Sequence, residues 1–199
     1  HAPAGRRGDV AALLGPNGLD CLLSCQHLTR HPFTGTDPGG WGWSDLSGAV
    51  PDADDTPGAL LALDAWRKSK ACPKEQKPRI EEAAEKGIKW LLSLQNRDGG
   101  WPTFCRGWGK LPFDRSGSDL TAHVIRAIEL WCASDNVSGK RALRQADFGF
   151  GFTISKWHPD GSWLPLWFGN QDQPNDANKV YGTSKVLMAC SMLHRNDDL

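Results

Sequence analysis

A repeat of about sixty residues constrains the fold of this chain more than any other feature of its sequence. Trp41, Trp101 and Trp163 are 60 and 62 residues apart, and each ends a short segment rich in Gly, Asp or Pro. These residue types supply the backbone angles of tight turns, so we expect each tryptophan to close a turn. A repeating unit of this length cannot bury its apolar face alone, and its copies are therefore expected to stack.

Two helical patterns lie between successive turns. Apolar residues recur at helical spacing, and Thr56 followed by Pro57 is typical of a helix start. The patterns predict an all-α chain with six helices in three hairpins: one before residue 26, and others over about 56–68, 78–95, 118–133, 138–156 and 180–193. The connections are too long for a compact bundle. Gly149 and Gly151 weaken the fifth helical pattern.

Composition excludes several classes of function. Lys+Arg and Asp+Glu are both 23, so nothing in the charge favours a nucleic-acid partner. The six cysteines form no CxxC pair and have no histidine cluster at zinc spacing, so we expect no metal, no cofactor and reduced thiols in a cytoplasmic protein. Because the chain begins with His1 rather than Met, we interpret it as a piece of a longer protein.

The second turn carries a longer motif. Gln95 ends a predicted helix, and a Gly-rich turn leads from it to Trp101. This segment resembles the QW repeat of squalene and oxidosqualene cyclases, which are class II terpenoid cyclases. Gln26 and Trp41 resemble a first copy with a longer loop, whereas Trp157 stands in the glutamine position of a degenerate third copy. The glutamine amide is expected to cap a helix end, with the tryptophan ring stacked over it, and so to tie neighbouring hairpins together.

Three further segments are similar to motifs of the same family. The aromatic segment before Asp52-Ala53-Asp54-Asp55 is similar to the approach to its DxDD motif, although Pro57 replaces the usual alanine. Asp119-Leu120-Thr121-Ala122-His123 is similar to its D-x-T-A-H motif. Residues 160–183 resemble DGSW…W…YGT, with a longer loop over residues 168–179.

The resemblance implies a fold. The family's catalytic domain is a double ring of twelve helices, of which this chain would supply about half. We therefore expect a partial α/α toroid, an incomplete (α/α)6 barrel of antiparallel hairpins, over residues 15–199. Residues 1–14 are expected to be a flexible N-terminal end.

The resemblance also implies a chemistry. Three carboxylates within four residues of a water-poor site cannot all ionise, so one proton stays in the cluster. By resemblance Asp54 donates that proton to an alkene, while Asp52 and Asp55 tune and hold it. His123 would be hydrogen-bonded to the donor and oriented by Asp119.

Protonation of an alkene leaves a carbocation, which aromatic faces stabilise without attacking it. The chain has ten tryptophans and seven phenylalanines to draw on. By position in the family, Trp43, Phe104 and Trp167 would line the cavity, and Tyr181 would lie near the acid. The expected substrate is a hydrophobic polyprene such as squalene.

Two alternatives remain open on the sequence. A relative of the protein prenyltransferase β-subunit would share the toroid but needs an Asp/Cys/His zinc site, which the spacing does not supply. A non-catalytic toroid that binds an apolar ligand or a protein partner would tolerate Asp54→Asn. We expect the parent protein to lie peripherally on a membrane, and the isolated piece to be inactive and to self-associate through uncovered apolar faces.

Overall fold

The computed structural model describes residues 10–32, 34–132 and 137–193 of the chain. These residues form α-helices and two short 3-10 helices but no β-strand, which confirms the all-α prediction. The helices are α1 (Val10–Ser24), α2 (Asp55–Lys68), η1 (Lys74–Gln76), α3 (Lys77–Leu94), α4 (Ser118–Cys132), α5 (Val137–Ser155), η2 (Pro174–Asp176) and α6 (Lys179–Leu193). Within the described ranges, none of these helices has both the length and the apolar character needed to span a bilayer.

The predicted helices and the observed ones agree closely where both can be compared. Residue 133, at the end of one predicted helix, lies outside the described residues, as do residues 194–199 of the predicted toroid. Residues 1–9 of the predicted flexible end also lie outside them, and α1 begins at Val10, inside that predicted end.

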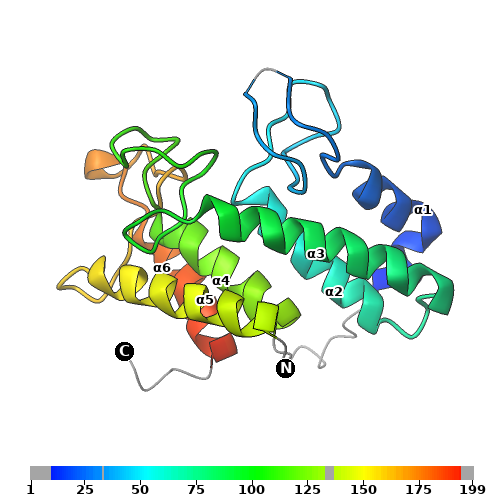
Figure 1. The fold of residues 1–199 in the computed structure, drawn as a ribbon. Helices are drawn as coiled ribbons and strands as arrows, with labels where there is room; N and C mark the ends of the chain where they lie inside the picture. Colours follow the sequence, from blue (N-terminus) through cyan, green and yellow to red (C-terminus); the bar gives the residue numbers. More distant parts are fainter. Residues whose placement is uncertain (1–9, 33, 133–136, 194–199) are drawn as a thin grey trace, which may run out of the picture.

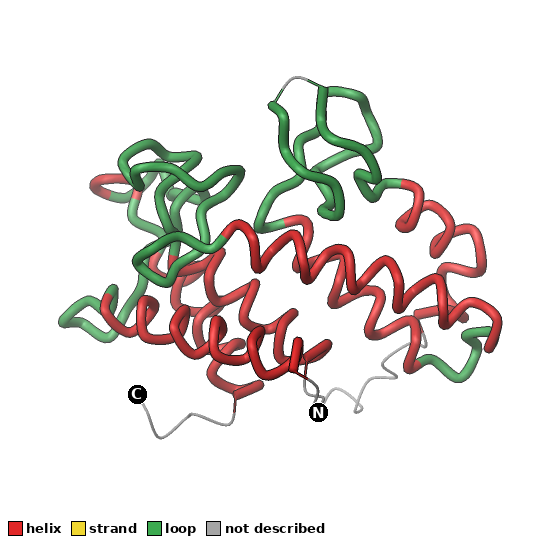
Figure 2. Tube along the Cα trace, in the orientation of Figure 1, coloured by secondary structure: helices red, strands yellow, loops and turns green. Residues whose placement is uncertain are grey.

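The helices form two layers of a partial α/α toroid (Figure 1). Helices α2, α4 and α6 form the inner layer, in which α4 packs against both α2 and α6. Helices α1, α3 and α5 form the outer layer, where α1 packs on α2, α3 on α2 and α4, and α5 on α4. The long loops that lead into α2, α4 and α6 all lie along one edge of this arrangement (Figure 2). The starts of the inner helices therefore share that edge.

The three turn tryptophans are buried and make the same pair of hydrogen bonds. Each indole N–H donates to a carbonyl of the preceding outer helix, and each backbone N–H donates to a threonine hydroxyl in the first turns of the following inner helix. The acceptors are Leu22 and Thr56 for Trp41, Leu91 and Thr121 for Trp101, and Thr153 and Thr183 for Trp163, at 2.7 to 3.1 Å. Each turn thus ties one outer helix to the next inner helix.

The repeat glutamines tie neighbouring hairpins together, as predicted, but they do so without capping helix ends. The side-chain amide of Gln95 donates to the turn carbonyl of Gly99 at 2.7 Å and to the carbonyl of Gln145, inside α5, at 2.8 Å. The amide of Gln26 likewise reaches the carbonyl of Gly39 and that of Ala83, inside α3. A carbonyl has two lone pairs, so one within a helix can still accept a second hydrogen bond. The glutamines therefore join successive outer helices.

The third, degenerate copy replaces this amide with a ring. Trp157 stacks on Trp163 with the ring centroids 5.7 Å apart and the planes 8° from parallel. Trp163 is only 2% exposed, although Trp157 itself is 43% exposed. The tryptophan in the glutamine position thus covers the turn tryptophan.

A glycine in the following outer helix makes room for each of the first two turn tryptophans. A Cβ atom on Gly87 would lie 2.8 Å from Cζ3 of Trp41, and one on Gly149 would lie 2.5 Å from Cζ3 of Trp101. Gly151, two residues further along α5, would meet nothing within 4 Å. Of the two glycines that weaken this helix in sequence terms, Gly149 therefore has a packing role.

Alanine substitutions at the two α5 glycines should have opposite effects. Gly149→Ala forces a methyl group into the Trp101 ring and should lower the free energy of unfolding by about 1–3 kcal/mol. Gly151→Ala is the matched control, and should raise it by about 0.5–1 kcal/mol because alanine favours the helix. Urea denaturation followed by circular dichroism measures both changes. A stabilising effect at both positions would contradict the packing role of Gly149.

Candidate functional site

The three acidic residues of the Asp52–Asp55 segment lie at the start of α2. Oδ1 of Asp52 accepts the backbone N–H groups of Asp54 at 2.8 Å and of Asp55 at 2.7 Å. These are N–H groups that the first turn of a helix leaves without an intrahelical partner. Asp52 is 4% exposed and therefore acts as a buried cap. Its neighbour Ala53 donates its backbone N–H to the carbonyl of Thr103, which fixes the segment against the following loop.

Two basic side chains from the other inner helices meet Asp54. Nδ1 of His123, on α4, lies 3.1 Å from Oδ1 of Asp54, and Nζ of Lys185, on α6, lies 3.7 Å from the same oxygen. The contact between His123 and this carboxylate cluster was expected from the sequence. Lys185 was not singled out there, because a single lysine on a helix is ordinarily a solvated surface residue.

The repeat explains why these residues converge. His123 follows Thr121 by two residues, and Lys185 follows Thr183 by two residues. Since each threonine accepts the backbone N–H of a turn tryptophan, His123 and Lys185 occupy the same position in successive repeats. The equivalent residue on α2 is Gly58, where a Cβ would lie 3.9 Å from Cε1 of His123. This register, readable from the sequence, is the signal that would have located Lys185.

Asp119 does not make the contact expected of it. Its Oδ1 accepts the backbone N–H of Leu166 at 3.1 Å, and its buried Oδ2 has no hydrogen-bond partner among the described residues. Neither oxygen of Asp119 accepts a hydrogen bond from His123 among the described residues. Asp119 instead anchors the loop that follows Trp163 to the start of α4.

The aromatic residues proposed for the cavity lie on the loops beside this cluster. Trp43 and Phe104 form an edge-to-face pair with centroids 6.1 Å apart. The indole N–H of Trp167 donates to the hydroxyl of Thr103 at 2.6 Å. Thr103, which sequence reasoning missed, thus contacts both Ala53 and Trp167 and joins three loops. Trp43 and Trp167 are 58% and 46% exposed, so their rings are open to further contacts.

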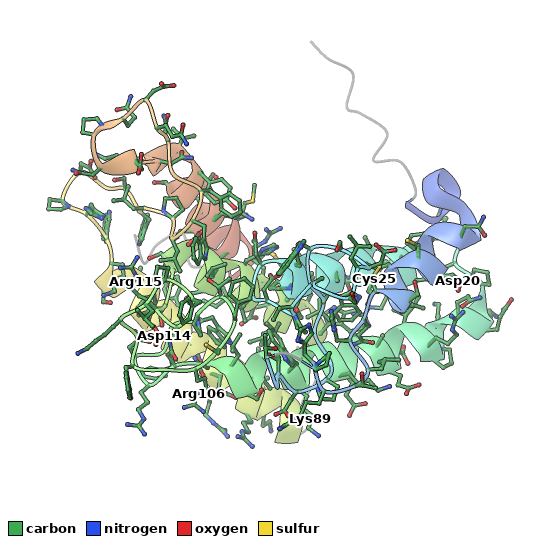
Figure 3. The ribbon with its side chains drawn as sticks, turned by 90° about the horizontal axis from the view of Figure 1, so that it is seen from above. Asp20, Cys25, Lys89, Arg106, Asp114 and Arg115 are labelled. Carbon is green, nitrogen blue, oxygen red and sulfur yellow. The ribbon has the colours of Figure 1, made fainter. Side chains whose placement is uncertain are left out.

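The loop that carries Phe104 is folded around a buried carboxylate. Asp114 accepts the backbone N–H of Trp108 at 3.0 Å and that of Leu111 at 2.8 Å. Figure 3 shows Asp114 with Arg106 and Arg115 at the end of the molecule away from α1. The two arginines are exposed residues of this loop. Neither arginine is among the groups that pair with Asp54, which are His123 and Lys185.

Tyr181 lies next to Lys185 on α6. The ammonium of Lys185 is 5.3 Å from the centroid of the Tyr181 ring, and Phe168 contacts the same ring at 4.8 Å between centroids. Burial raises the pKa of the Tyr181 hydroxyl, so this group stays neutral. Tyr181 thus supports the cation that contacts Asp54.

The pKa values of the carboxyl groups in the cluster are shifted in opposite directions. The hydrogen bond from His123 and the nearby charge of Lys185 hold the pKa of Asp54 below its usual range. Burial, with the neighbouring Asp55, raises the pKa of Asp52 to about 8. Burial also raises the pKa of Asp119 to about 6 and lowers that of His123. These shifts favour a proton on Asp52 and a negative charge on Asp54.

Residues 30–198 match the model of the family described as the squalene-hopene cyclase C-terminal domain. A squalene–hopene cyclase of Bradyrhizobium diazoefficiens is 28% identical over 218 residues, covering 100% of this chain and 30% of the relative. The sporulenol synthase of Bacillus subtilis is 43% identical over 165 residues, covering 74% of this chain and 23% of the relative. The chain thus spans less than a third of the length of these relatives.

One solved structure shares the helical arrangement. It is a possible member of the GH105 family from Salmonella enterica, with a TM-score of 0.50 and 15% sequence identity over 73% of this chain and 38% of that one. At this identity the likeness shows the fold alone. In the described part of the chain, no group of three or more His, Cys, Asp or Glu residues is arranged to hold a metal ion.

The raised pKa of Asp52 predicts a pH-dependent stability. Between about pH 6 and pH 8 the folded chain keeps a proton on Asp52 that the unfolded chain has lost. The free energy of unfolding should therefore fall as pH rises, by up to about 1.4 kcal/mol per pH unit. Asp52→Asn should flatten this slope, because asparagine keeps the cap but does not titrate. Urea denaturation at pH 6, 7 and 8 measures the slopes.

The control for this experiment is Asp45→Asn, which changes an exposed carboxylate outside the cluster. It should keep the slope of the unchanged chain. Equal slopes for the unchanged chain and for Asp52→Asn would show that Asp52 ionises normally in the folded state.

Proposed function

We propose that this chain, which belongs to the squalene-hopene cyclase C-terminal domain family, carries the proton-donating part of a triterpene cyclase site. The reaction would be the protonation of an alkene of a polyprene such as squalene, followed by cyclisation of the carbocation. The observation that carries the proposal is the 3.1 Å contact between Nδ1 of His123 and Oδ1 of Asp54. It joins two motifs that lie 69 residues apart in the sequence.

Asp54 is proposed as the donor. In the protonating step its O–H bond breaks, a C–H bond forms, and the alkene becomes a tertiary carbocation beside an aspartate. His123 stabilises the aspartate left behind, since a hydrogen bond to a carboxylate favours its charged form. The same interaction makes protonated Asp54 a strong acid, which protonation of an isolated alkene requires. Asp52 lies two residues before Asp54, and its proton can reprotonate Asp54 after the transfer.

The aromatic residues would stabilise the cation after the proton has moved. Trp43, Phe104 and Trp167 present rings on loops next to the Asp52–Asp55 segment. A cation over such a ring gains about 0.5–1 kcal/mol when exposed and about 2 kcal/mol when water is excluded. Trp43 and Trp167 are about half-exposed in this chain, so the site needs a covering surface before the larger value applies. The isolated chain is therefore proposed to be inactive on its own.

A second candidate is a non-catalytic toroid that binds an apolar ligand or a protein partner. Its support is that Asp54 is held in its charged form by two basic side chains, whereas a working donor must carry a proton. The two candidates differ in whether the Asp54 proton is needed. A ligand-binding domain does not need it.

The donor role is tested by Asp54→Asn in the full-length protein that contains this chain. Asparagine keeps the size of the side chain but has no proton to transfer. Turnover of squalene should therefore fall by at least about 10²-fold, the lower end of what general acid catalysis supplies, while squalene binding changes little. Gas chromatography with mass spectrometry of the extracted lipids measures the cyclised product.

Asp45→Asn serves as the matched control in the same assay, and should leave turnover unchanged because Asp45 is an exposed loop residue. Full turnover in Asp54→Asn would rule out the cyclase mechanism and favour the non-catalytic toroid.

A further inference from the structure

Lys185 contacts the acid cluster at Asp54, although no motif contains it. Its side chain is 20% exposed, and its Nζ lies 3.7 Å from Oδ1 of Asp54. The ammonium is held over the Tyr181 ring, 5.3 Å from its centroid, one helical turn earlier on α6. A largely buried ammonium requires compensation for its lost hydration. The carboxylate of Asp54 and the face of Tyr181 provide that compensation.

The contacts of the Asp54 carboxyl are asymmetric. His123 and Lys185 both approach Oδ1, one from each of the two other inner helices. Among the described residues, the Asp54 carboxyl therefore makes both its hydrogen bond with His123 and its ion pair with Lys185 through Oδ1. Oδ1 is thus occupied by contacts with His123 and Lys185, whereas Oδ2 can carry a proton.

We propose that Lys185 is a positioning residue of the acid site, which acts with His123 to hold Oδ1 of Asp54 so that Oδ2 carries the transferable proton. The catalytic meaning of this role rests on the proposed function, but the contact with Asp54 does not. When the Oδ2–H bond breaks and the proton goes to an alkene carbon, the negative charge left on the carboxylate is neutralised through Oδ1.

Lys185 supplies what His123 alone does not. Burial lowers the pKa of His123, so its ring is largely neutral near pH 7 and contributes a hydrogen bond rather than a full charge. The ammonium of Lys185 brings a full positive charge to the same oxygen. A positive charge at this distance strongly favours the carboxylate over the carboxylic acid. Lys185 therefore adds to the hydrogen bond of His123 in making Asp54 a stronger acid than Asp52.

Other titratable groups around Asp54 either favour or oppose its negative charge. Asp55, from the start of α2, and Asp119, from α4, oppose a further negative charge when they are ionised, whereas Asp52 favours its neutral form. His123 donates or carries a proton on the side of α4, where Arg126 also acts on the histidine. Tyr181, on α6, stays neutral. Within this set Lys185 and His123 are the groups paired directly with Asp54.

The test is a pH titration of the carboxyl carbons by 13C NMR, using this chain and its variants at Lys185. Loss of one resonance in Asp54→Asn assigns the Asp54 signal. Lys185→Met removes the charge with little change of length and should raise the pKa of Asp54 by about one unit. Lys185→Arg keeps the charge and should restore a value near that of the unchanged chain. Lys179→Met, on the same helix and paired with Asp160, is the matched control and should leave Asp54 unchanged.

Amide spectra of each variant establish that the fold is retained, and Lys185→Gln provides a second neutral variant if Lys185→Met does not fold. An unchanged pKa of Asp54 in a folded neutral variant would overturn the proposal. In the full-length protein, the same neutral variant should move the alkaline limb of the pH–rate profile to higher pH. If the unchanged protein makes no cyclised product, the proposed function fails, and the NMR titration still decides the role of Lys185.

Discussion

The hydrogen bonds of the turn tryptophans position everything else in this chain. Each tryptophan joins a carbonyl of an outer helix to a threonine hydroxyl at the start of the next inner helix. Thr56 follows Asp54 by two residues, and Thr121 precedes His123 by two residues. The hydrogen bonds that stack the hairpins therefore also set the distance between the carboxylate and the histidine. Structure and proposed chemistry share one set of contacts, so a change at a turn tryptophan would alter both.

The helices could be predicted almost entirely from the sequence, because their determinants are local, whereas the toroid was implied by the resemblance to a family. Turn residues, helix starts and apolar spacing located α2 to α6 to within a residue or two at the ends that can be compared. The tie between neighbouring hairpins was expected of the glutamines, but the carbonyls that they contact could not be predicted in this way. The amide of Gln95 bonds to Gln145, 50 residues away, and that choice depends on how neighbouring hairpins stack. The helix-capping part of the prediction was wrong because the amides contact carbonyls inside α3 and α5 rather than at helix ends.

The candidate site was only partly accessible from the sequence, for the same reason. The meeting of His123 with the Asp52–Asp55 segment followed from resemblance to a family, and its distance of 3.1 Å came from the structure. Lys185 has no signal of its own, but the repeat places it in α6 where His123 stands in α4. Asp119 occupies, two residues before Thr121, the position that Asp54 occupies before Thr56. Its bond to Leu166 depends on a loop conformation that no periodic pattern encodes.

Two opposing effects act on the charge of Asp52 at the start of α2. The first turn of a helix favours a negative charge, which opposes a retained proton. Burial beside Asp55 favours the neutral acid, and it raises the pKa of Asp52. A neutral carboxyl group can satisfy both, because its carbonyl oxygen accepts the N–H groups of Asp54 and Asp55 while the other oxygen carries the proton. The cap therefore needs no charge, and the proton is stored beside Asp54 without loss of the hydrogen bonds that begin α2.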